Sequence, residues 1–258
     1  MFRPKSIVVL ACLFTLAMVL AACGGADSAL PPPPATVSVA VANGKPINPT
    51  EPIVVAATDG TLKDVAVTNA SGKAVAGTLD GDATHWSTTE DLGYDATYTV
   101  RATAVNADNA PVAKTFNVIT IAPEFTAYAN VIPAPEVVDG VGIGVGQPMV
   151  FQFTKPVKNR DEVQKRLKVT TAPAQPGAWY WIDDQNVHYR GPEYWKPGTK
   201  IHIEADIYGV DLGDGVYGAE DTAMDYTVHD SWIAKADGAT ELLTVFHNGK
   251  QVKQMPMS

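Results

Sequence analysis

The side chains able to do metal or acid–base chemistry are few and widely separated. The five histidines are His85, His188, His202, His229 and His247. Their spacing is not the short spacing of tetrahedral metal sites, so we expect no metal ion and no cofactor. His85 and His188 fall at equivalent positions of an internal repeat, which favours a shared packing role over two sites.

The acidic residues also lack the arrangement of a site. The segment 211–221 is acidic and glycine-rich, but it lacks the alternating oxygen ligands and closing Glu of a calcium loop. We therefore expect a turn between strands. Asp183 and Asp184 are adjacent beside a predicted turn, which favours solvated acids over a facing catalytic pair. The sequence contains no Ser-x-x-Lys, Gly-x-Ser-x-Gly or His-Glu-x-x-His motif.

Aromatic residues gather in one part of the chain. They are Trp179, Tyr180, Trp181, Tyr189, Tyr194 and Trp195. Flat apolar rings can stack on the sugars of a glycan strand, and Trp179, Tyr194 and Trp195 are the candidate contacts. The alternative, which we favour, is that Trp181 and Trp195 fill a sandwich core. Tyr98 stands where a tyrosine corner would lie, which is a structural role.

The N-terminus has the form of a secretory signal. Arg3 and Lys5 precede an uncharged apolar run over 6–19. The run is shorter than the roughly 20 apolar residues of a membrane-spanning helix, so we expect its removal. It ends in Leu20-Ala21-Ala22-Cys23-Gly24, which resembles the lipobox of bacterial lipoproteins. That resemblance implies a lipid thioether on Cys23; the alternative is an ordinary cleavage site that happens to hold a cysteine.

Cysteine use and charge limit the partners. Cys12 and Cys23 are the only cysteines, so a processed and lipidated chain would have neither a disulfide nor a free thiol. The formal charge of −9 becomes more negative once Arg3 and Lys5 are removed, which argues against a nucleic-acid partner. We expect a monomer attached to the outer face of the cell membrane by fatty acids such as palmitate.

The remainder of the chain indicates an all-β protein. Short apolar or alternating runs are separated by Asn-Gly, Asp-Gly and Ser-Gly turns. The clearest predicted strands are 37–41, 52–57, 63–68, 97–104 and 114–120, and 160–167 is the one short helix. This pattern predicts two tandem immunoglobulin-like antiparallel β-sandwiches followed by an incomplete β-hairpin.

An internal repeat supports the tandem arrangement. One constant offset in residue number places His85-Trp86 on His188-Tyr189, Leu92 on Trp195, Val100 on Ile203 and Ala102 on Ala205. We expect a signal over 1–22, a proline-rich linker over 23–35, sandwiches over 36–122 and 123–229, and a hairpin segment over 230–258. An isolated hairpin is marginal in water, so the last segment either packs on the second sandwich or opens a third domain.

Two segments of the second repeat resemble a known family. The stretch 189–199 places a proline before an aromatic pair and then Gly-Thr, and 208–218 is a glycine-rich turn. Both resemble the long lipoprotein-type L,D-transpeptidases of actinobacteria, especially mycobacteria. The resemblance implies a lipobox, two immunoglobulin-like domains, and a catalytic domain that opens with a hairpin like the one over 242–257. It also implies a role in peptidoglycan cross-linking during cell wall biogenesis.

One departure from that family concerns the nucleophile. The family uses the cysteine of a Ser-His-Gly-Cys motif, assisted by an upstream histidine, and no cysteine follows Cys23 here. As given, the chain is therefore not expected to be an enzyme, whether it is a natural truncation or a partial sequence. We expect a non-catalytic, membrane-tethered spacer or positioning arm. The alternative is a complete envelope lipoprotein that binds peptidoglycan or a protein partner through its Ig-like domains. Catalytic residues supplied by a partner chain are a third interpretation, which nothing in the sequence favours.

Overall fold

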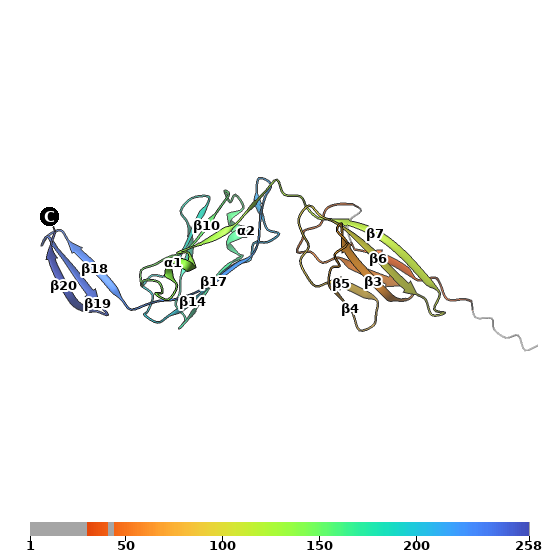
Figure 1. Ribbon diagram of the computed structural model, residues 1–258, viewed down its shortest axis with the longest axis horizontal. Helices are drawn as coiled ribbons and strands as arrows, with labels where there is room; N and C mark the ends of the chain where they lie inside the picture. Colours follow the sequence, from red (N-terminus) through yellow and green to blue (C-terminus); the bar gives the residue numbers. More distant parts are fainter. Residues whose placement is uncertain (1–29, 41–43, 258) are drawn as a thin grey trace, which may run out of the picture.

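The computed structural model describes residues 30–40 and 44–257. The predicted signal, Cys23 and the first part of the linker lie outside these described residues. Figure 1 shows two β-sandwiches and a small terminal sheet following one another along the chain. The predicted all-β class, with tandem sandwiches, is therefore confirmed.

The first sandwich contains one four-stranded and one three-stranded antiparallel sheet. The first sheet has the order β1 (Thr36–Val39), β2 (Val54–Thr58), β5 (His85–Thr88), β4 (Gly77–Leu79). The second has the order β3 (Thr61–Asn69), β6 (Thr97–Val105), β7 (Pro111–Ile119). Successive side chains of a strand point to opposite faces. In β6, Tyr98, Val100, Ala102 and Ala104 are buried while the residues between them are not.

The second sandwich repeats this topology. Its four-stranded sheet has the order β9 (Ala129–Ile132), β10 (Met149–Phe153), β13 (Asn186–Arg190), β12 (Ala178–Trp181). Its three-stranded sheet has the order β11 (Leu167–Ala172), β14 (Lys200–Ala205), β17 (Thr222–Thr227). Val100 and Ile203, equivalent in the predicted repeat, are both 0% exposed on equivalent strands. The repeat is therefore confirmed.

Smaller elements contribute residues to the core of the second sandwich. A three-stranded sheet has the order β15 (Asp211–Gly213), β16 (Val216–Gly218), β8 (Phe125–Ala127), and β16 and β8 run parallel. The helices are α1 (Pro135–Val138) and α2 (Arg160–Gln164). The helix predicted over 160–167 was too long, because Leu167 already belongs to β11, where it pairs with Ala205 of β14.

The terminal segment forms three strands, one more than the two of the predicted hairpin. The sheet has the order β18 (Trp232–Asp237), β19 (Leu242–His247), β20 (Lys250–Pro256). The predicted turn is present, with Asn248 at φ 47° and Gly249 at φ 78°. The predicted hairpin is β19 and β20, and β18 adds a third strand that pairs with β19 along its full length. Ile233 of this sheet packs against the core of the second sandwich.

Candidate functional site

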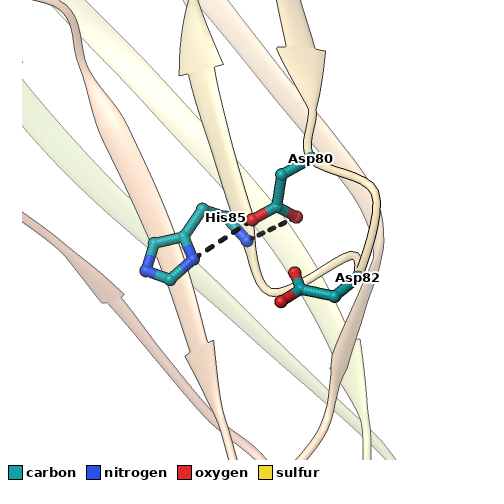
Figure 2. Close-up of side chains that lie close together, drawn as sticks. All are labelled: Asp80, Asp82 and His85. Atoms are coloured by element: carbon teal, nitrogen blue, oxygen red, sulfur yellow. Dashed lines mark hydrogen bonds and ion pairs between the residues drawn. The ribbon is translucent and has the colours of Figure 1, made fainter.

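Three potential metal ligands meet at the turn between β4 and β5. Asp80, Asp82 and His85 each place one ligand atom so that all three atoms lie within 4.8 Å of one another, and all three residues are exposed (Figure 2). This group was not predicted, although the pattern Asp80-x-Asp82-x-x-His85 is visible in the sequence. The histidine comes from the start of β5 and the acids from the turn before it.

The contacts of these acids show what they already do in the fold. Asp80 Oδ1 accepts hydrogen bonds from the backbone N–H groups of Thr84 (2.9 Å) and His85 (3.0 Å). Asp82 Oδ1 accepts from the Thr84 hydroxyl at 2.7 Å, and this bond is the main reason that the pKa of Asp82 lies below its usual value. Such side-chain-to-backbone bonds are typical of acidic turns. Turn closure is therefore sufficient to explain the group.

Three of the other histidines, His202, His229 and His247, contact acidic residues in two separate places. His202 lies between Asp225 and Glu204 on the three-stranded sheet, 2.8 Å and 2.9 Å away. Asp230 contacts both His229 and His247, and the hydrogen bond with His247 is the main cause of its lowered pKa. Among residues 30–40 and 44–257, Asp80, Asp82 and His85 form the only group of three ligands with metal-like proximity.

Of the three aromatic candidates, Trp195 lies in the core. It is 4% exposed and its indole N–H donates to the Gln147 carbonyl at 2.7 Å. A ring buried in this way offers no face to a sugar from solvent, so the core alternative is the one the structure supports for Trp195. The buried ring also stacks on Tyr189, with 6.4 Å between centroids and 7° between planes.

Trp179 and Trp181 cover the edge of that core from β12. Trp179 stacks on Phe151 at 5.7 Å, and Trp181 stacks on Phe153 at 5.7 Å. Both tryptophans are half-buried, so the core alternative for Trp181 holds in part. Tyr194, in contrast, is 52% exposed. The three candidate glycan contacts therefore do not form one exposed platform.

The described residues contain no cysteine, so they hold no thiol nucleophile. Cys23 lies outside them, and its predicted lipidation stays a prediction. Within the part of the chain the structure describes, no helix is long and apolar enough to cross a membrane.

Comparison with known proteins places the chain in a family. The family model described as a bacterial Ig domain matches residues 44–211. The chain therefore belongs to the bacterial Ig domain family.

Curated relatives of the chain include L,D-transpeptidases of Mycobacterium tuberculosis. L,D-transpeptidase 2 of Mycobacterium tuberculosis (strain CDC 1551 / Oshkosh) is 40% identical over 208 residues, which cover 80% of this chain and 50% of the relative. L,D-transpeptidase 5 of strain ATCC 25618 / H37Rv is 33% identical over 249 residues, covering 93% and 54%. The predicted resemblance to mycobacterial-type L,D-transpeptidases is confirmed.

A solved structure of an LD transpeptidase in complex with imipenem is also similar. It is 25% identical, has a TM-score of 0.39, and the match covers 50% of this chain and 51% of that one. The chain spans about half the length of the curated relatives it matches.

Proposed function

We propose that these residues form the membrane-tethered spacer arm of an L,D-transpeptidase-like protein of peptidoglycan cross-linking. The observation that carries the proposal is the succession of two complete sandwiches of the same topology, followed by a terminal sheet (Figure 1). Each sandwich has its own buried core, so each is a stable folded domain that adds to the length of the arm. The described residues contribute stiffness and reach, and no described thiol contributes acyl transfer.

The N-terminal part of the proposal is lipid attachment at Cys23. The signal would be removed and the fatty acids, such as palmitate, would hold a monomer at the outer face of the cell membrane. The proline-rich residues before β1 support this arrangement, because a polyproline segment is extended and keeps a domain away from its anchor. No nucleic-acid partner is proposed, since the chain carries a formal charge of −9.

Metabolic labelling with an alkyne fatty acid tests the tether. The full chain should carry the label and fractionate with membranes, whereas Cys23→Ala should lose both. Cys12→Ala is the matched control, because Cys12 would leave with the signal. Label retained in Cys23→Ala would overturn the proposed tether.

Sedimentation with purified sacculi separates the spacer from a peptidoglycan-binding module. A spacer should remain in the supernatant. Specific retention, reduced by Tyr194→Ala, would instead support the alternative of an envelope lipoprotein that binds peptidoglycan. A covalent carbapenem adduct on these residues would contradict the non-catalytic role, because it requires a nucleophile.

A further inference from the structure

The first sandwich contacts the second through the turn before β6, which meets Gly209 and the short strand β16. Tyr94, in the turn before β6, reaches the second sandwich with its hydroxyl group. Its Oη accepts a hydrogen bond from the Gly209 N–H at 2.8 Å and donates one to the Gly218 carbonyl at 2.7 Å. Tyr208 reaches in the other direction, and its hydroxyl donates to the Leu92 carbonyl at 2.5 Å. The contacts therefore cross the boundary from both sides.

The tyrosine rings pack against one another at the same place. Tyr94 meets Tyr208 edge-on at 5.0 Å between centroids and Tyr217 edge-on at 6.2 Å. These geometries are favourable for aromatic pairs. Burial raises the pKa of Tyr94 to about 12, so its hydroxyl keeps its proton further into the alkaline range than a free tyrosine does. We call Asn48, Leu92, Tyr94, Tyr208, Gly209, Tyr217 and Gly218 the tyrosine clamp.

Gly209 fits the tyrosine clamp only because it has no side chain. Its φ is +75°, and an added Cβ would lie 2.4 Å from Asn48 Oδ1 and 2.9 Å from Thr50 Cγ2. This close approach allows Asn48 Nδ2 to donate a hydrogen bond to the Gly209 carbonyl at 2.6 Å. The first sandwich is thus seated directly against the backbone of the second.

The connection between the sandwiches leaves little freedom. Ile121 is tied to the first sandwich, because its N–H donates to Ile47 (2.9 Å) and its carbonyl accepts from Asp95 (2.9 Å). Glu124 is tied to the second through its N–H and the Gly215 carbonyl at 3.1 Å. Ala122 and Pro123 alone lie between these anchors, and proline fixes its own φ.

We propose that the tyrosine clamp and this short connection hold the two sandwiches as one rigid body, so that the arm transmits a fixed direction as well as a length. Relative motion is the default for domains joined by a small interface. Here, hydrogen bonds from both sides, packed rings and a two-residue connection oppose it. The use of that rigidity for positioning rests on the function proposed above, whereas the rigidity itself does not.

Distance measurement by double electron–electron resonance tests the proposal on the full chain in detergent. Cys12 and Cys23 are replaced by serine, and spin labels are placed at Lys73→Cys and Lys165→Cys, both exposed and one in each sandwich. The unmodified clamp should give one narrow distance distribution. Tyr94→Phe, which keeps the ring and removes both hydroxyl bonds, should broaden it about twofold as the sandwiches gain the freedom of loosely joined domains.

Two matched controls make the result specific. Gly209→Ala should broaden the distribution, whereas Gly198→Ala should not, because Gly198 has a similar φ of +81° but no atom within 4 Å of an added Cβ. Tyr98→Phe removes a hydroxyl bond inside the first sandwich and should also leave the width unchanged. A broad distribution with the clamp intact, or unchanged widths in both clamp variants, would overturn the proposal. Neither outcome depends on lipid labelling or sacculus binding, so failure of the proposed function is recognised separately.

Discussion

Tyr98 illustrates how one hydroxyl group fixes a turn of the first sandwich. The Gly93 N–H donates to Tyr98 Oη at 2.7 Å, and Tyr98 is 5% exposed. The predicted tyrosine corner is thereby confirmed. Tyr98→Phe should lower the free energy of unfolding by about 1 to 3 kcal/mol, because the Gly93 N–H loses its acceptor. Urea denaturation measures the change.

The control for this substitution is Tyr128→Phe. Tyr128 is 48% exposed, so its replacement should change the free energy of unfolding by less than about 0.5 kcal/mol. Equal losses in the two variants would show that the corner hydrogen bond is not the cause.

His202 makes stability depend on pH. Its hydrogen bond with Asp225, and then that with Glu204, raises its pKa above the usual value. Because the raised pKa belongs to the folded state, the stabilisation is complete below the unfolded-state pKa of about 6.5 and is lost as pH rises through the folded-state pKa. The gain should be below about 1 kcal/mol, because these charges are solvent-exposed.

His202→Gln removes the titrating group and should flatten this part of the pH profile. The urea midpoints of the unchanged chain and of His202→Gln, at about pH 5.5 and about pH 8.5, measure this pH dependence. The same decline in both proteins over that interval would assign the pH dependence to another residue.

Edge strand β12 carries Trp179 and Trp181, and both stack on phenylalanines of the core. Trp179 is half-buried against Phe151 and Tyr189, with centroid distances of 5.7 Å and 5.1 Å. Trp179→Ala should therefore lower the free energy of unfolding by about 2 kcal/mol, less than for a fully buried tryptophan. Tyr194→Ala, at a 52% exposed position, should have little effect. Chemical denaturation checks both, and an unaffected Trp179→Ala would leave Trp179 free for ligand contact.

We expect the order of the terminal sheet to depend on the turn between β19 and β20. Asn248 and Gly249 both have positive φ, as a two-residue hairpin turn of this kind requires. Gly249→Val should weaken the pairing of these strands, because a β-branched residue is strained at φ 78°. Amide hydrogen exchange of β19 and β20 should accelerate.

Gly238 supplies the control within the same sheet. It lies in the β18–β19 turn without a positive φ, and an added Cβ would meet no atom within 4 Å. Gly238→Val should leave the exchange rates close to those of the unchanged chain. Equal acceleration by both substitutions would mean that the conformation of Gly249 is not the reason.

Periodicity predicted the long strands well and the short ones poorly. The alternating run over 97–104 became β6, because alternation is a direct consequence of one buried face. β5 is only His85–Thr88, and its burial alternates over too few residues to stand out from a turn. β18 was missed because its residues are mostly exposed, so no apolar pattern marks it.

Contacts at the scale of the whole molecule could not be read from the sequence. Tyr94 and Gly209 are 115 residues apart, and Tyr94 and Gly218 are 124 apart. Tyr94 and Gly209 lie in turns and Gly218 ends the short strand β16, and residues of these types also suit solvent-exposed loops. Their meeting depends on how two sandwiches are oriented, and local patterns carry no information about that orientation. In contrast, the core position favoured for Trp195 is confirmed: Trp195 is 4% exposed, and Leu92 at the equivalent position of the repeat is 3% exposed.

Because the two sandwiches have separate buried cores, we expect them to unfold in two steps. Ile53 belongs to the first core and Ile203 to the second, and both are 0% exposed. Replacing either by alanine should cost about 3 kcal/mol. For sandwiches of this size, that loss lowers the melting temperature of the affected unit by more than about 10 °C. In calorimetry, Ile53→Ala should shift one transition and Ile203→Ala the other. A single transition shifted by both would mean that the tyrosine clamp couples unfolding as well as orientation, because destabilising either core would then unfold its neighbour.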